Sequence, residues 1–364
     1  MNKESEIYDR VAEAWRLPGS SRFIKILEIS FTPEQGKALL QLNIPMTCDE
    51  LAVKLDMSKE DVQRTLDSLT GWVLRTDGKY ISMPNFIGVM PSKSLPGIPH
   101  EKVMELWSDF WRSGEYPRWL LDTWVRMESM VGHAVHRILP VRRALAASSK
   151  ILPEQILWYE DMPEMFRRAK KITIGNCGCR SVWGNCNYPM ETCISVSYQA
   201  VSDVPGPRKE ITADEAIAIC EKCEDEGMLN IPPNQAEAIL FCNCCPCCCE
   251  VAHPYIEYGN AITRKANLSP SRYKATVDQE SCIGCQNCME RCHFSAIEMT
   301  KTLKSKKLKA SVKSEVCMGC GLCVLTCEQK ALTMELVRPP DHIPTGGTPA
   351  DRKKRLSVPN WLTA

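Results

Sequence analysis

The feature that most constrains this chain is a cysteine pattern, C-x2-C-x2-C-x3-C, that occurs twice in its C-terminal part. The two runs consist of Cys282, Cys285, Cys288 and Cys292, and of Cys317, Cys320, Cys323 and Cys327. Two-residue gaps let successive thiolates of one tight loop point inward at one cluster, while the fourth ligand comes from elsewhere. This spacing is typical of proteins that hold two cubane iron–sulfur clusters. The pattern therefore predicts two 4Fe–4S clusters and a protein that transfers electrons.

Two other roles for these cysteines fit the pattern less well. Zinc ribbons also use paired C-x2-C motifs, but they separate the pairs by a long loop, whereas here each run is contiguous. Disulfides are disfavoured because the N-terminal segment MNKESEIYDRVAEAW has no apolar signal core that would indicate export. Because the chain has 21 cysteines, we expect metal ligands in a reducing, anaerobic cytoplasm.

Length, charge and motifs limit the remaining function classes. The 364 residues leave room for two or three domains, and the net charge of +1 favours neither nucleic acid nor an anionic membrane. No apolar stretch reaches the length needed to span a bilayer. The sequence contains neither G-x-G-x-x-G nor G-x-x-x-x-G-K, so we predict no nucleotide cofactor site, and it lacks the C-x-x-C-H motif of covalent haem.

The segments SCIGCQNCMERCHFSAIEM and VCMGCGLCVLTCEQKALTM resemble bacterial-type two-cluster ferredoxins. In that family the fourth cysteine of each run crosses to the other cluster. The resemblance implies one cluster on Cys282, Cys285, Cys288 and Cys327, and a second on Cys317, Cys320, Cys323 and Cys292. The family usually has proline after the fourth cysteine, where this chain has His293 and Glu328. We expect cluster binding to survive, and interpret His293 as a surface residue or as a hydrogen-bond donor to a cluster sulfur.

Residues 1–95 are predicted to form a winged-helix-like domain. Three helical stretches between residues 33 and 83 precede a hairpin signal at Asp77-Gly78. This layout suggests DNA binding, yet residues 33–83 carry six basic against eight acidic side chains, a net charge of −2. Because phosphate contacts dominate affinity for DNA, we expect the domain to dock a protein or to act as a scaffold instead.

Residues 96–170 are predicted to be helical and are rich in tryptophan, and the Pro- and Gly-rich stretch at 84–100 is interpreted as a linker or lid. The tryptophans are Trp107, Trp111, Trp119, Trp124 and Trp158. One interpretation is that they pack the helices together. The other is an interface for a partner subunit or a substrate pocket, because Trp is favoured where a large apolar body meets a polar rim.

Residues 171–262 are predicted to be a separate cysteine-rich module with a small α/β fold. Two apolar stretches, KITIG and AILF, lead into the strings NCGC and CNCCPCCC. Cysteine loops at the ends of two strands would converge at one edge of a sheet and form a metal cage. The expected ligands are Cys177, Cys179, Cys186, Cys193, Cys242, Cys244 and Cys245.

The type of this middle metal centre stays open at the level of sequence. A third iron–sulfur cluster is the leading interpretation, and zinc and a redox-active thiol or disulfide pair are the alternatives. The six cysteines between positions 242 and 249 cannot all bind one cubane, because adjacent side chains diverge, so some are structural or belong to a second centre. Cys220 and Cys223 share a helical face and are expected to be buried thiols. Arg180 would lie beside the thiolates and raise the potential of the centre.

The order of these motifs, with ILWYEDMPEMFRRAKKITIGNCGCR and ILFCNCCPCCC ahead of the doubled run, carries a second resemblance. It is similar to a family of 4Fe–4S proteins of anaerobic bacteria and archaea, in which a ferredoxin follows an N-C-x-C-R and C-N-C-C-x-C-C-C module. The similarity covers roughly residues 150–335. It implies an electron-transfer component and says little about a reaction.

The C-terminal part is predicted to consist of a ferredoxin-like two-cluster domain at 263–337 and a flexible tail at 338–364. Its insert MTKTLKSKKLKASVKSE alternates like a hairpin, and its lysines would steer an acidic redox partner. The whole chain is thus predicted to be an α+β multidomain, cytoplasmic electron-transfer protein, a subunit or partner of a larger anaerobic oxidoreductase. A redox-sensing winged-helix regulator and a reductase acting at the middle cluster are the rival hypotheses, and no catalytic residue is predicted.

Overall fold

The computed structural model describes residues 5–69, 72–76, 78–82, 94–198, 208–259, 268–302 and 305–344. The chain splits into two compact units, residues 1–130 with 348–364 and residues 131–347. The division falls inside the Trp-rich region at 96–170, so its helices belong to different units. Most of the predicted linker at 84–100 and of the tail at 338–364 lies outside the described residues. In the part of the chain that is described, every helix is too short or too polar to cross a bilayer.

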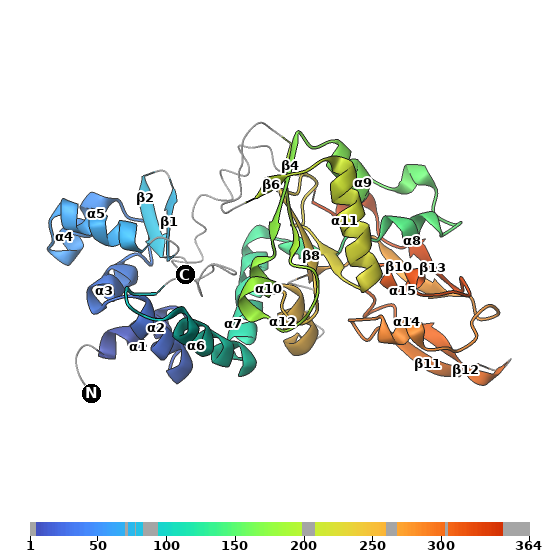
Figure 1. Ribbon diagram of the computed structural model, residues 1–364, viewed down its shortest axis with the longest axis horizontal. Coiled ribbons are helices and arrows are strands. Elements are labelled where there is room, and N and C mark those ends of the chain that lie inside the picture. Colours follow the sequence, from blue (N-terminus) through green and yellow to red (C-terminus); the bar gives the residue numbers. More distant parts are fainter. Residues whose placement is uncertain are drawn as a thin grey trace. The chain divides into compact units, whose positions relative to one another are not determined.

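The first unit is mainly helical. Its elements are α1 (Ser5–Ala14), α2 (Ser21–Ser30), α3 (Pro33–Gln41), α4 (Cys48–Leu55), α5 (Lys59–Ser68), β1 (Val73–Thr76), β2 (Lys79–Ser82), α6 (His100–Arg112) and α7 (Glu115–Val131) (Figure 1).

The core of this unit is aromatic. Trp15 stacks on Trp72 with ring centroids 5.4 Å apart, and the indole nitrogen of Trp119 donates to the backbone carbonyl of Trp15 at 2.8 Å. The tryptophans of α6 and α7 are all buried: Trp107, Trp111, Trp119 and Trp124. Burial of this kind confirms the helix-packing interpretation for these four residues.

The segment predicted to be winged-helix-like folds as three helices, α3 to α5, followed by the antiparallel hairpin of β1 and β2. Helix α4 begins with a capping box, in which the backbone N–H of Thr47 donates to the Glu50 carboxylate at 2.7 Å and the N–H of Glu50 donates to the Thr47 hydroxyl. Leu51, Val62 and Leu66 pack the helices together. Asp77 of the predicted turn lies outside the described residues. A winged-helix role stays a prediction.

The second unit contains one larger sheet and several two-stranded ones. Its strands are β3 (His136–Arg137), β4 (Lys171–Asn176), β5 (Glu191–Ser197), β6 (Lys209–Glu210), β7 (Leu229–Ile231), β8 (Leu240–Cys244), β9 (Leu268–Ser269), β10 (Tyr273–Val277), β11 (Ile297–Thr302), β12 (Ser305–Val312) and β13 (Leu332–Leu336). Its helices are α8 (Arg142–Ala146), α9 (Met162–Arg167), α10 (Gly178–Trp183), α11 (Ala213–Glu226), α12 (Ala252–Tyr258), α14 (Asn287–Glu290) and α15 (Leu322–Leu325), with the 3-10 turns Pro153–Gln155 and Pro340–His342.

The five-stranded sheet has the order β6-β4-β5-β8-β7, and its neighbouring strands pair antiparallel. Strands β4 and β8, which correspond to the predicted KITIG and AILF stretches, therefore run in the same direction with β5 between them. Because β4 and β8 run in the same direction, their C-terminal ends lie on the same side of the sheet, and both strands lead into cysteines there. This side is called the edge of the sheet below. The prediction that the two cysteine strings converge at one edge is thus confirmed, with an intervening strand that the sequence did not indicate.

Helices α9 and α11 cover this sheet. Phe166 of α9 packs on Phe241 of β8 with ring centroids 4.9 Å apart, and Cys220 of α11 belongs to the same core. Helix α11 starts with a second capping box, formed by Thr212 and Glu215. Both Cys220 and Cys223 are buried, as predicted.

Two buried arginines tie the segment after residue 131 to the rest of the second unit. Arg272, just before β10, pairs with Glu160 at 2.6 Å, and the two side chains are 3% and 0% exposed. Arg137 donates to the backbone carbonyls of Pro233 at 2.6 Å and Tyr159 at 2.6 Å. Burial lowers the pKa of Arg137 to about 10. These contacts explain why the cysteine-rich module and the doubled cysteine run belong to one compact unit.

Candidate metal centres

The first three cysteines of the first run line a small cavity. The cysteines around it are Cys282, Cys285, Cys288 and Cys327. The loop between the first two turns at Gly284, whose φ is +77°, and a Cβ there would lie closer than 3.0 Å to the carbonyl oxygen of Leu308. The loop thus requires glycine, both for its left-handed backbone and for its close approach to β12.

The first three cysteines of the second run line a matching small cavity. The cysteines around it are Cys292, Cys317, Cys320 and Cys323. Gly319 occupies the place of Gly284, with φ +68° and a Cβ position that would clash with the carbonyl oxygen of Tyr273. The fourth cysteines are also equivalent, because the N–H of Ala296 donates to Cys292 Sγ and that of Ala331 to Cys327 Sγ, both at 3.3 Å.

The thiols of these cavities fit a cationic metal group. Burial raises the pKa of Cys320 to about 12 and raises the pKa of Cys292 and Cys323 as well. A buried thiolate therefore needs a metal to compensate its charge, as cysteine ligands do when they bind a metal and lose their protons. The two groups of four coincide with the two sets that the ferredoxin resemblance implies.

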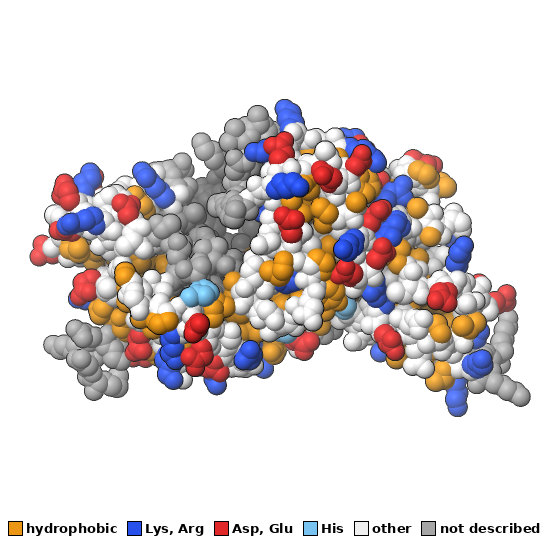
Figure 2. Space-filling view, in the orientation of Figure 1, with side chains coloured by type: hydrophobic (Ala, Val, Ile, Leu, Met, Phe, Trp, Pro, Cys, Tyr) orange, Lys and Arg blue, Asp and Glu red, His pale blue; other side chains and the backbone are white. Residues whose placement is uncertain are grey.

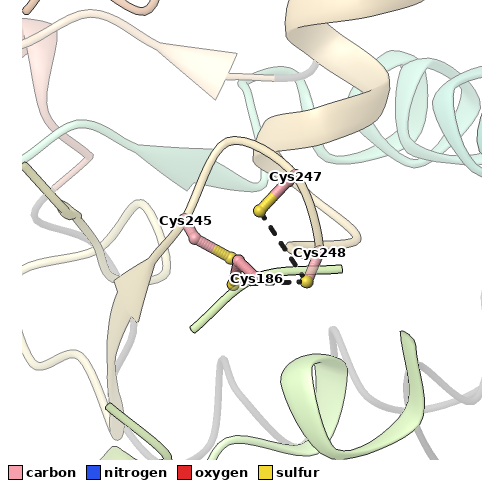
Figure 3. Close-up of side chains that lie close together, drawn as sticks. All are labelled: Cys186, Cys245, Cys247 and Cys248. Atoms are coloured by element: carbon pink, nitrogen blue, oxygen red, sulfur yellow. Dashed lines mark hydrogen bonds between the residues drawn. The ribbon is translucent and has the colours of Figure 1, made fainter. Parts of the chain in front are cut away.

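Four thiols of the cysteine-rich module converge at the edge of the five-stranded sheet (Figure 3). The four-thiol cluster consists of Cys186, Cys245, Cys247 and Cys248, whose Sγ atoms all lie within 4.8 Å of one another. Cys186 follows α10, and the other three lie in the turn after β8. Hydrogen bonding from Cys248 lowers the pKa of Cys245 to about 5, whereas burial raises the pKa of Cys247 to about 12. The close packing of these sulfurs thus shifts the pKa values of neighbouring thiols in opposite directions.

A second thiol group lies at the same edge and consists of Cys177, Cys179, Cys244 and Cys249. Hydrogen bonds from Cys179 and Cys244 hold the pKa of Cys249 well below its usual range. A hydrogen bond from Cys179 also lowers the pKa of Cys177 to about 7. The remaining pair, Cys193 and Cys242, face each other across β5 and β8.

Residues 275–334 match the family model of the 4Fe-4S dicluster domain. The match covers both cavities, so the doubled run belongs to an iron–sulfur domain, which is called the dicluster domain below. No curated protein and no solved structure matches the chain. Together with the four-thiol cluster, the dicluster domain indicates iron–sulfur electron transfer and metal binding.

The seven cysteines predicted to bind metal in the module are divided between these groups. Two of them belong to the four-thiol cluster, three to the second thiol group and two to the facing pair in the sheet. The sequence reasoning did not assign Cys247, Cys248 and Cys249, because it assumed that adjacent side chains diverge. That holds in a strand, but the turn at 246–248 places Cys247 Sγ 3.8 Å from Cys248 Sγ. Pro246, a turn residue, was the available signal.

Arg180 lies beside the thiols, as predicted. Its side chain is 2% exposed and donates to the carbonyl of Asn243 at 3.0 Å and to the Thr192 hydroxyl. Burial lowers the pKa of Arg180, but the charge of Cys177 and a hydrogen bond to Cys245 outweigh it, and the net shift is upward. A permanent positive charge therefore stands between the two thiol groups and stabilises thiolates in both.

His293 is not the solvent-facing residue that the sequence suggested. Its Nε2 lies 2.7 Å from the carbonyl oxygen of Gly227, at the end of α11, and burial lowers its pKa. Arg291 donates to the carbonyls of Glu224 at 2.8 Å and of Asp225 at the same helix end. Both neighbours of Cys292 are thus attached to the helix that covers the cysteine-rich sheet.

Proposed function

We propose that the protein is a cytoplasmic iron–sulfur electron-transfer protein, a subunit or partner of a larger oxidoreductase, that carries electrons between a redox partner and the cysteine-rich module. The observation that carries this proposal is the grouping of eight cysteines into two equivalent cavities inside the dicluster domain. All 21 cysteines are free thiols in the structure, so the eight of the doubled run are available as ligands.

Each cavity would hold one 4Fe–4S cluster through cysteines of both runs. Cys327 joins the first three cysteines of the first run, and Cys292 joins those of the second. When bound, such clusters supply one-electron transfer at a potential set by nearby charge, hydrogen bonds and solvent exposure. The N–H donors of Ala296 and Ala331 lower the negative charge density on the crossing sulfurs.

The two cavities have different surroundings. This difference indicates which cluster would exchange electrons with the cysteine-rich module and which with the redox partner. The cavity that includes Cys292 is next to the cysteine-rich module, because Arg291 and His293 bind the end of α11 and the charge of Cys245 acts on His293. The other cavity opens to solvent, since Cys285 is exposed and Ile283 is 51% exposed. We therefore assign the first to exchange with the module and the second to exchange with the partner.

The surface around the solvent-facing cavity supports a redox protein with acidic side chains as the partner. The predicted hairpin of the lysine-rich insert is present as β11 and β12, which pair antiparallel. Leu308 of β12 is 45% exposed, and Lys301 and Lys307 are exposed around it. Figure 2 shows apolar and basic side chains side by side in this region. Apolar contact with a rim of positive charge would let an acidic protein approach and pack closely.

Iron analysis of cysteine variants tests the crossed ligation directly. Protein purified without oxygen should carry about eight irons and eight sulfides per chain. We expect Cys285→Ser to remove about half of this iron, Cys285→Ser with Cys327→Ser to remove no more than that, and Cys285→Ser with Cys292→Ser to remove nearly all of it. The control is Cys48→Ser, in the first unit, which should keep every cluster.

Two results would reject the proposal. If the variants with Cys327 and Cys292 changed lost iron in the reverse order, the ligand sets would be wrong. If the unaltered protein held zinc without sulfide in the dicluster domain, electron transfer by this domain would be excluded, because zinc has no accessible redox step.

A further inference from the structure

We propose that the four-thiol cluster binds a single metal ion in tetrahedral coordination, and not a third cubane. This inference takes one assumption from the proposed function, namely that the cysteine-rich module binds metal and works together with the dicluster domain. It replaces the leading interpretation of the sequence, a third iron–sulfur cluster, with a site of different stoichiometry.

The spacing of the sulfurs carries the argument. Four thiolates that bind one metal at about 2.3 Å in a tetrahedron lie about 3.8 Å apart. Cys186 Sγ lies 3.6 Å from Cys248 Sγ, which lies 3.8 Å from Cys247 Sγ, and all four sulfurs are within 4.8 Å of one another. The sulfur atoms of the side chains in Figure 3 thus already lie close to the positions that four thiolates take around one metal ion.

A cubane requires a different arrangement of its cysteine ligands. Each cysteine binds a different iron, so four irons and four sulfides must fit between the thiolates. Among the described residues, the cysteines of the two dicluster cavities are not gathered within 4.8 Å of one another, unlike those of the four-thiol cluster. Thiols that nearly touch leave space for one ion, so the same chain builds two kinds of cysteine site.

The backbone around the four-thiol cluster holds these sulfurs in place. The ring of His253, in α12, lies 3.1 Å from the carbonyl oxygen of Pro246 and fixes the turn from outside. Asn185, next to Cys186, donates to the carbonyl of Cys247 at 3.5 Å, which joins the loop after α10 to the same turn. A metal ion would therefore cross-link two segments that are 62 positions apart in the chain.

The charge of the site suits a divalent ion. Four thiolates and one such ion leave a net charge of −2, and the buried Arg180 next to Cys245 compensates part of it. Zinc and ferrous iron both accept four thiolates in a tetrahedron. Zinc would make the site a structural cross-link, and iron would make it a one-electron centre that the dicluster domain could reduce.

Metal and sulfide counts on the full-length protein separate these possibilities. We expect about one metal ion beyond those of the two cubanes, with no additional sulfide. Cys247→Ser and Cys186→Ser should each remove that ion and leave the sulfide content unchanged. Cys223→Ser, a buried thiol of the same module outside the four-thiol cluster, should keep the ion. X-ray absorption of the extra metal should show sulfur at about 2.3 Å and no neighbouring metal.

Either metal, zinc or iron without sulfide, would support the inference. Loss of about four irons together with about four sulfides in Cys247→Ser would overturn it in favour of a cubane. Retention of all metal in both serine variants would overturn it as well. Because the sulfide content reports the dicluster domain separately, a protein with the single ion but without sulfide would refute the proposed function and leave this inference standing.

Discussion

Replacing Gly284 by alanine should remove the cluster from the solvent-facing cavity and leave the other cavity filled. With φ at +77°, a side chain at this position costs about 1–2 kcal/mol of backbone energy. The new Cβ would also lie closer than 3.0 Å to a backbone oxygen of β12, and overpacking of this kind adds about 1–3 kcal/mol. β12 is paired with β11 and cannot withdraw freely, so the loop must move instead and would carry Cys282 and Cys285 out of position.

Anaerobic iron analysis and EPR of the reduced protein measure the effect. We expect about four irons per chain in Gly284→Ala, against about eight in the unaltered protein. Gly78→Ala is a matched control, because Gly78 has a φ of +78° but no non-neighbouring atom of the described residues within 4 Å of its Cβ position. This variant should therefore have the same backbone cost and keep all iron. Eight irons in Gly284→Ala would refute the claim that this loop admits only glycine.

Three further predictions concern stability and partner choice. Glu160→Ala leaves the charge of the buried Arg272 without a counter-ion and should lower the free energy of unfolding by about 3–5 kcal/mol in urea titration. Glu164→Ala, which breaks an exposed ion pair, should lower it by less than about 0.5 kcal/mol. Equal losses in the two variants would contradict this account. Leu51→Ala, at a fully buried position, should cost about 2–5 kcal/mol, and Val53→Ala, 84% exposed on the same helix, should stay within about 0.5 kcal/mol. The full-length protein should show no salt-sensitive binding to duplex DNA, because acidic and basic side chains are interspersed over α4 and α5 (Figure 2); micromolar binding that weakens as salt rises would favour the regulator hypothesis.

Local patterns in the sequence predicted much of this structure. The doubled cysteine run indicated the dicluster domain, and the apolar stretches KITIG and AILF correspond to strands β4 and β8. Each of these signals involves residues within a few positions of one another. The same is true of the hairpin of the lysine-rich insert, whose alternation follows the two-residue period of a strand.

Features that depend on distant residues escaped the sequence reasoning. Strand β5, with the sequence ETCISVS, lies between β4 and β8 and pairs with both. No local sequence pattern identifies these two partners. The four-thiol cluster joins Cys186 to a turn that becomes recognisable only when Pro246 is read as a change of backbone direction. The hydrogen bond of His293 to Gly227 likewise links positions 66 residues apart. Such contacts follow from the arrangement of whole elements.

The separation between Cys186 and the turn after β8 also sets an order of events during synthesis of the chain. Cys186 leaves the ribosome long before its partners, and it cannot meet them until residue 248 has emerged and β8 has paired with β5. The ion would therefore be captured late, by a sheet that is already assembled, and not by a nascent loop. Each cavity of the dicluster domain closes later still, because Cys327 and the second run follow downstream. Metal that reaches the chain earlier would meet incomplete ligand sets, such as Cys186 alone or the first three cysteines of one run.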